Sequence, residues 1–166
     1  MATNSGKTKV TLPTNEQILI TREFNAPKHL VYRAWTTPEL VRRWWCGQRG
    51  EMSVVEIDLR VGGKWRYVLV ASGGFDVAFH GTYREIVSNE RIVTTEVFEM
   101  PDTPEPSDEQ APLNIITFSE NNGVTSLSLI VQCPTQELRD IIMSSGMEAG
   151  LQEQMDELEA LLALLL

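Results

Sequence analysis

Six segments of strand length follow one another between Met52 and Gln132, each with apolar and polar residues in near alternation. Short runs such as Gly62-Gly63 and Asn121-Asn122-Gly123 separate them and supply the positive φ angles at which an antiparallel chain reverses. The segments cover residues 53–59, 63–70, 75–87, 91–100, 113–120 and 124–132. Because such closely spaced strands pair with their neighbours, the pattern predicts an antiparallel meander.

The residues before this meander predict one more strand and two short helices. Residues 17–24 alternate as a strand does, and Pro27 and Pro38 each suit the first turn of a helix. Apolar residues recur at helical spacing after both prolines. Residues 1–16 carry no such pattern and are expected to form a flexible tail, which leaves residues 17–166 as a single domain.

The last segment predicts one long amphipathic helix from Thr135, a suitable N-cap, to about Leu164. Leucine, isoleucine and methionine recur there at helical intervals. Gly146 and Gly150 fall in the middle of this helix, where a glycine costs about 1 kcal/mol relative to alanine. Close approach of the sheet backbone is the simpler explanation for them, and room for a ligand beneath the helix is the alternative.

Together these elements predict an α+β fold in which one long helix covers a curved, seven-stranded antiparallel sheet. An antiparallel sheet twists and curls, so a straight helix laid across its concave face leaves a gap. Alternation assigns Trp65 and Tyr67 to the inner face of one strand, and Phe79 and Tyr83 to the inner face of the next. We therefore expect an apolar cavity between the sheet and the helix.

The net charge of -9 is concentrated in the second part of the chain, where residues 92–166 hold 14 acidic residues and one basic residue, Arg139. Such a surface repels phosphate backbones, so nucleic acid is excluded as a partner. No apolar run approaches the roughly 20 residues of a membrane span, and the polar start lacks the apolar core of a signal peptide. A cytoplasmic protein is therefore expected.

The sequence lacks the residue patterns that are typical of catalytic and metal sites. It contains no phosphate loop, dinucleotide fingerprint, nucleophile elbow or metalloprotease helix. Cys46, Cys133, His29 and His80 have no metal-ligand spacing, so we expect no metal, no cofactor and no disulfide. Glu96 would serve as an acid or base if it were buried, but the pattern favours a side chain that faces solvent.

Several stretches also match those of a known family in order and spacing. They are residues 21–27 (TREFNAP), 31–36 (VYRAWT), 44–45 (WW), 61–67 (VGGKWRY), 81–86 (GTYREI) and 90–93 (ERIV). Together, over about residues 17–163, the chain resembles the Activator of heat-shock-protein-90 ATPase homologue family of the START-like (SRPBCC) superfamily. The resemblance implies the birch-pollen-allergen-like helix-grip fold, with a cavity that in this superfamily commonly binds lipids, polyketides or other hydrophobic molecules. It covers only one domain of the eukaryotic chaperone activators, so direct chaperone activation is not expected.

We therefore expect the chain to bind a small hydrophobic molecule in its cavity. The residues expected to line the cavity are Trp35, Trp44, Trp45, Trp65, Tyr67, Phe79, Tyr83, Glu96, Met147 and Leu151. Two alternatives stay open: a protein partner such as a chaperone, bound by the acidic helix or by residues 101–112, and a cyclase- or dehydratase-like enzyme that uses the same cavity. The leucines from Leu161 to Leu166 indicate either a homodimer or an exposed apolar end.

Overall fold

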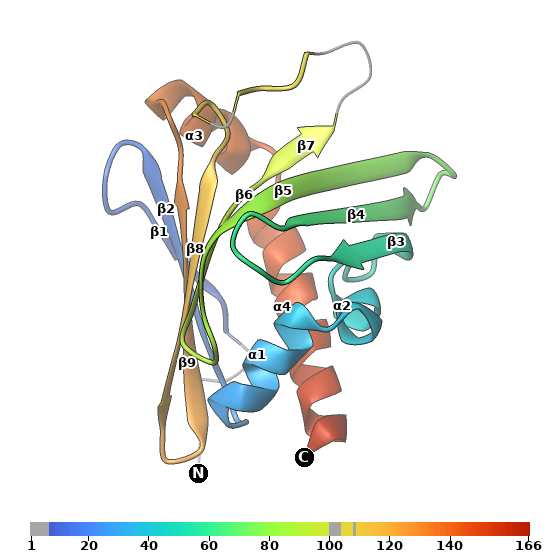
Figure 1. The fold of residues 1–166 in the computed structure, drawn as a ribbon, viewed down its shortest axis with the longest axis vertical. Coiled ribbons are helices and arrows are strands. Elements are labelled where there is room, and N and C mark those ends of the chain that lie inside the picture. The colour runs from blue at the N-terminus through green and yellow to red at the C-terminus, as the bar shows by residue number, and fades with distance from the viewer. Residues whose placement is uncertain (1–6, 100–103, 108) are drawn as a thin grey trace.

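The strands form one strongly bent antiparallel sheet (Figure 1). The computed structural model of the chain describes residues 7–99, 104–107 and 109–166. Within these residues the sheet has nine strands in the order β1-β2-β9-β8-β6-β5-β4-β3, and β7 also pairs with β5. The strands are β1 (Lys9–Thr11), β2 (Gln17–Phe24), β3 (Gly50–Ile57), β4 (Lys64–Ala71), β5 (Asp76–Val87), β6 (Arg91–Thr95), β7 (Val97–Glu99), β8 (Leu113–Asn121) and β9 (Val124–Gln132).

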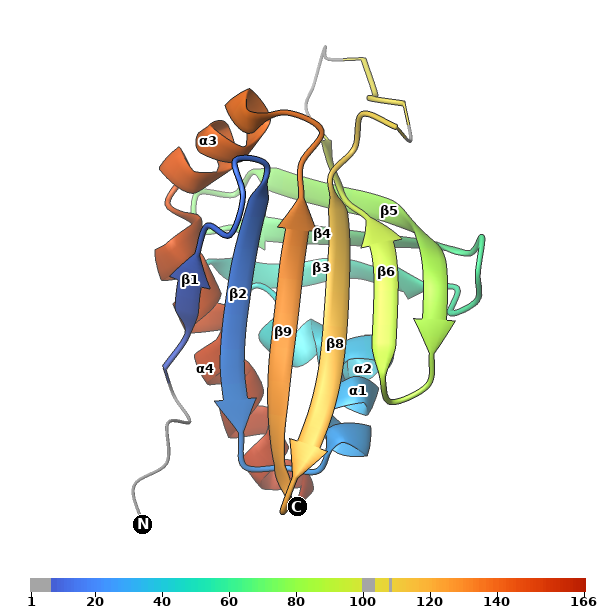
Figure 2. The same ribbon diagram turned by 90° about the vertical axis from the view of Figure 1, so that its left-hand side faces the viewer.

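The helices lie on the concave side of this sheet. They are α1 (Lys28–Thr36), α2 (Pro38–Trp44), α3 (Gln136–Ser144) and α4 (Met147–Leu165). Strands β3, β4 and β5 run across the direction of β8 and β9, and α1, α2 and α4 occupy the angle between these two halves (Figures 1 and 2). The arrangement is the α+β fold with a curved antiparallel sheet and a covering C-terminal helix that the sequence predicts.

Within the described residues, the structure has two strands more than the seven that the sequence predicts. Lys9–Thr11, expected to belong to a flexible tail, form β1, which pairs with β2 from Lys9 opposite Thr21 to Thr11 opposite Leu19. Such an edge strand is held by backbone hydrogen bonds, so it needs no apolar alternation of its own. The segment expected as one strand over residues 91–100 is divided at Glu96 into β6 and β7, and Met100 lies outside the described residues. The loop expected over residues 101–112 is described only in part, and there residues 104–107 are exposed.

The single long helix expected from Thr135 is also divided. Thr135 is the N-cap of α3, where its side chain accepts a hydrogen bond from the Leu138 amide. At Gly146 the backbone adopts a φ of +82°, and this residue is the N-cap of α4. A Cβ on Gly150 would lie 1.9 Å from Nη2 of Arg49, so that glycine makes room for a side chain. Close approach of the sheet backbone, the simpler explanation of both glycines, is therefore wrong.

The second half of α4 closes the core. Met155 and Leu158 are fully buried, together with Ile18 and Ile20 of β2. Arg22 continues the inner row of β2, and its buried guanidinium lies 2.8 Å from Asp156 and 3.3 Å from Glu159 on α4. Apolar contact and the two ion pairs of the buried Arg22 thus fix this half of α4 against the sheet.

Candidate functional site

At the kink between β6 and β7, the side chain of Glu96 lies on the concave face of the sheet, the face that Thr94 and Phe98 share. Before it, β6 pairs with β8 and with the second half of β5; after it, β7 pairs with Ala78–His80 of β5. The kink passes close to Gly81, where a Cβ would lie only 1.9 Å from the carbonyl oxygen of Thr95. The oxygen occupies the volume that any larger residue would need, so a glycine at this position permits the crossing.

Glu96 is a deeply placed carboxyl that keeps part of its accessible surface. Asn114 Nδ2, on the inner face of β8, donates a 2.9 Å hydrogen bond to Glu96 Oε1. Burial raises the pKa of the Glu96 carboxyl, and the hydrogen bond from Asn114 opposes that rise only in part. The residue is nevertheless half-buried and not fully enclosed. Glu96 is thus largely withdrawn from water, so the expectation that it faces bulk solvent is wrong.

Two tyrosines and a tryptophan share this inner face with Glu96. Burial raises the pKa of the Tyr67 phenol well above its usual value, and the nearby Tyr83 and Glu96 add to that rise. Burial also raises the pKa of Tyr83. Both phenols are therefore neutral hydrogen-bond donors at physiological pH. Trp65 Nε1 donates a 2.7 Å hydrogen bond to Thr94 Oγ1, which satisfies its only polar atom.

A row of five aromatic side chains leads from the inner sheet toward the surface. The ring centroids lie 4.6 Å apart for Trp65 and Tyr67, 5.1 Å for Tyr67 and Trp45, 5.1 Å for Trp45 and Phe79, and 5.2 Å for Phe79 and Phe98. Phe98 pairs with Phe79 in register, so it lies on the inner face of the sheet, yet it is 51% exposed. The inner face is thus uncovered at this end of the row.

Met147 and Leu151, in the first half of α4, are half-buried and pack against the core. Gln154 of the same helix donates a hydrogen bond to the Trp45 carbonyl, which ties α4 to the aromatic row. We call the region between the five aromatic rings and this half of α4, with Glu96 at its inner end, the aromatic recess.

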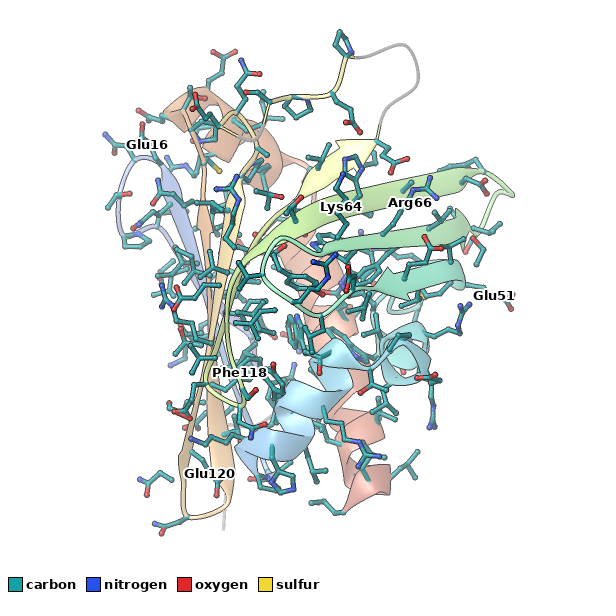
Figure 3. All side chains as sticks on the ribbon, in the orientation of Figure 1. Glu16, Glu51, Lys64, Arg66, Phe118 and Glu120 are labelled. Atoms are coloured by element: carbon teal, nitrogen blue, oxygen red, sulfur yellow. The ribbon has the colours of Figure 1, made fainter. Side chains whose placement is uncertain are left out.

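Two residues predicted to line the cavity lie elsewhere. Trp35 and Trp44 contact each other with ring centroids 4.7 Å apart, and Trp35 also meets Phe118 of β8 at 6.3 Å. Trp44 is buried, and its Nε1 donates a 2.9 Å hydrogen bond to the Ala34 carbonyl. Figure 3 shows Phe118 between the sheet and α1. These rings form packing contacts between α1, α2 and β8.

Phe98 belongs to the aromatic recess although the sequence prediction did not include it. Thr94 lies opposite Tyr83 and Phe98 lies opposite Phe79, so regular alternation places residues 94, 96 and 98 on the same inner face. The alternation of the strand residues is thus the sequence signal that identifies Phe98 as an inner-face residue.

The outer face of the same strands carries a charged cluster. Arg66 donates two 2.9 Å hydrogen bonds to Glu99, and these, with the contact from His80, lower the pKa of Glu99 to about 2. His80 Nδ1 lies 2.8 Å from Glu99, and its Nε2 lies 2.9 Å from Glu105. The cluster borders a surface hollow near Lys64, labelled with Arg66 in Figure 3. A second surface hollow lies along α3.

Within the described residues, no three His, Cys, Asp or Glu side chains are grouped so that they could hold a metal ion. Cys46 and Cys133 are free thiols, and burial raises the pKa of each. No helix in the described part of the chain has the length and apolar character needed to cross a membrane.

Solved structures of similar fold come from several organisms. A protein from Rhodobacter sphaeroides is similar with a TM-score of 0.85 and 21% identity, over 96% of this chain and 100% of that one. A protein from Mycobacterium smegmatis is similar with a TM-score of 0.82 and 21% identity, over 96% of this chain and 98% of that one. A protein from Chromobacterium violaceum is 28% identical, with a TM-score of 0.76 over 90% of this chain and 98% of that one. These likenesses confirm the predicted helix-grip fold.

None of the curated proteins matches the chain. The family described as Activator of Hsp90 ATPase homolog 1-like protein matches residues 25–163, which is most of the sequence. The match agrees with the resemblance carried by the sequence stretches and with the helix-grip arrangement of sheet and helices. The chain therefore belongs to the family of Activator of Hsp90 ATPase homolog 1-like proteins.

Proposed function

We propose that the chain binds a small hydrophobic molecule in the aromatic recess, with Glu96 as the hydrogen-bonding group at its inner end. The observation that carries the proposal is the row of five aromatic rings that leads from the buried Trp65 to the exposed Phe98, with Glu96 held by Asn114 on the same face of the sheet. A small number of polar groups in a mostly apolar recess is typical of ligand sites, because the apolar walls supply affinity and the polar group fixes orientation.

The packing around the recess supports an occupant. Met155 and Leu158, in the second half of α4, are fully buried, whereas Met147 and Leu151 in the first half are only half-buried. Methionine adapts its shape to a ligand at little cost, which suits a wall that closes on different molecules.

The other two expectations have less support. Asp156 and Glu159 of the acidic helix are paired with the buried Arg22, so part of its negative charge is used within the chain. Turnover would need a base or nucleophile beside Glu96, and the raised pKa values of Tyr67 and Tyr83 keep both phenols protonated. The free thiols fit a reducing compartment, and we place the protein in the cytoplasm on that basis.

Titration with N-phenyl-1-naphthylamine, a neutral fluorophore whose emission rises in apolar surroundings, tests the proposal. Phe98→Ala should weaken binding about fivefold, because an aromatic contact contributes about 1 kcal/mol. Phe75→Ala is the matched control: Phe75 is also exposed, at 61%, but lies in the turn before β5. Leu151→Trp should block binding by filling the recess.

An absent fluorescence response in the wild-type protein would refute the proposal. Equal effects of Phe98→Ala and Phe75→Ala, or unchanged binding in Leu151→Trp, would place the fluorophore outside the recess. Circular dichroism of each variant confirms that the fold is kept.

A further inference from the structure

The helices leave the outer face of one half of the sheet uncovered. Figure 2 shows β1, β2, β9, β8 and β6 in front of α1, α2 and α4. Leu19 of β2 alternates with fully buried residues, so its side chain points away from the core. The strand register sets Leu19 beside Ile130 of β9, Ile130 beside Ile115 of β8, and Ile115 beside Val93 of β6. These four residues form an apolar row across four strands, which we call the outer row.

The outer row is separate from the interior of the molecule. Leu19, Ile130 and Ile115 are half-buried and lie outside the hydrophobic core that the described residues form. The two rows that flank it on β2, β9 and β8 carry no charge and consist of Gln17, Gln132 and Leu113 on one side and Thr21, Ser128 and Thr117 on the other. An apolar row with uncharged neighbours on both sides is typical of an interface that excludes water.

The charged side chains of this face lie at its margins. Lys9 lies on β1, Glu23 near the end of β2, and Arg91 of β6 pairs with Glu85 of β5 at 3.2 Å. These two positive and two negative charges cancel. Because the chain carries a net charge of -9, two copies repel each other over most of their surface, and the neutral outer face is where they approach most easily.

The outer face is also complementary to itself. The strand order β1-β2-β9-β8-β6-β5 is symmetric about a line midway between β9 and β8. A two-fold axis along this line would set Ile130 against the partner's Ile115 and Leu19 against the partner's Val93. The same rotation brings Lys9, which pairs with no carboxylate of the described residues, to the partner's β5 margin, where Glu85 lies.

We infer that the outer face binds the same face of a second copy of this chain, with the two-fold axis parallel to the strands. Aligned sheets pack about 10 Å apart, and the side chains of the two outer rows interdigitate between them. Strand spacings of about 4.8 Å and a rise of about 3.4 Å per residue give the face from β1 to β5 an area of roughly 24 by 20 Å. Two copies cover roughly 1,000 Å² in projection, the low end of specific interfaces, so the dimer is reversible. The interface lies on the opposite side of the sheet from the aromatic recess and does not depend on a ligand.

Sedimentation velocity of the full chain tests the inference. The sedimentation coefficient of the wild type should rise from the monomer to the dimer value between about 5 and about 500 μM. Ile130→Lys should weaken the dimer at least tenfold, because it places an unpaired charge at the centre of the interface. Val70→Lys is the matched control: Val70 is 36% exposed on the outer face of β4, in the other half of the sheet. Both variants lower the net negative charge equally, so a loss of association in Ile130→Lys alone reports the outer row.

A second pair of variants tests the two-fold axis. Lys9→Glu should weaken the dimer severalfold at low salt, because it sets a carboxylate against the partner's Glu85. Lys64→Glu makes the same change of charge at an exposed position on β4 and should leave association close to that of the wild type. Equal weakening in both variants would overturn the proposed axis.

A wild-type protein that stays monomeric over the whole concentration range would overturn the inference. Association that persists in Ile130→Lys would also overturn it and would favour the end of α4, where Leu164 and Leu166 are exposed and Leu161 and Leu162 are buried. Circular dichroism of each variant shows that the fold is kept. Dilution of the ¹⁵N-labelled wild type gives an independent reading, since the amides that shift with concentration should lie on β2, β9, β8 and β6.

Discussion

Removing the two carboxylates that face Arg22 should destabilise the protein more than removing the charge of Arg22 itself. The Arg22 side chain is fully buried, 2.8 Å from Asp156 and 3.3 Å from Glu159. In Asp156→Asn/Glu159→Gln the guanidinium would stay buried without a counter-ion, which costs roughly 3–5 kcal/mol for a fully buried pair. The two carboxylates are 54% and 41% exposed, so solvent screening reduces the expected loss to about 2–3 kcal/mol.

Arg22→Met removes the charge and keeps an apolar side chain of similar length beside Phe24, whose ring centroid lies 5.5 Å from the guanidinium carbon. The half-exposed carboxylates can then turn to water, so we expect a loss of only about 1 kcal/mol. Urea unfolding at pH 7, followed by tryptophan fluorescence, measures the free energy of unfolding of both variants. A larger loss for Arg22→Met than for the double variant would refute the argument that the buried guanidinium depends on its counter-ions.

Three further changes test the kink, the recess and the outer cluster. Gly81→Ala would place a Cβ 1.9 Å from the Thr95 carbonyl oxygen, so thermal unfolding should show a loss of about 3 kcal/mol or more in the free energy of unfolding. A near-neutral effect would contradict the close approach of the Thr95 carbonyl to Gly81. Burial raises the pKa of Glu96, so its stabilising contribution is complete below the unfolded-state value and is lost as pH rises through the folded-state value. Glu96→Gln should therefore gain stability relative to the wild type in urea unfolding as pH rises above the ordinary carboxyl value of 4.5, and a constant difference would count against a buried carboxyl. Hydrogen bonds from Arg66 and His80 lower the pKa of Glu99 from 4.5 to about 2. The stability lost in Glu99→Gln should therefore be greatest above pH 4.5 and vanish as pH falls from 4.5 to about 2. A loss of stability that persists at about pH 2 would contradict the assigned contacts.

The order of the elements could be predicted because it depends on local information. The strands at Gln17–Phe24 and Val124–Gln132 have the bounds that alternation predicts. Of the two prolines expected in a first helical turn, Pro38 begins α2, whereas Pro27 is the N-cap directly before α1. The burial of Trp65, Tyr67 and Tyr83 likewise agrees with their alternation. Each of these features repeats over several residues, so a single exception does not change the prediction.

The features that shape the recess depend on single residues and on distant contacts. The division of the C-terminal helix depends on one positive φ at Gly146, which a glycine permits but does not require. The close approach of the chain at Thr95 depends on Gly81, far away in the sequence, which leaves room for the Thr95 carbonyl. Thr94, Glu96 and Phe98 alternate regularly onto the inner face, so the sequence pattern itself carries the orientation of Glu96 and Phe98.

The most direct test of the account is a crystal structure of the protein soaked with N-phenyl-1-naphthylamine. We predict electron density for the fluorophore between Phe79 and the first half of α4, with its amine within hydrogen-bond distance of Glu96. Density confined to the surface hollow beside α3 or to the hollow beside Lys64, with side chains of the chain itself filling the space next to Glu96, would contradict it.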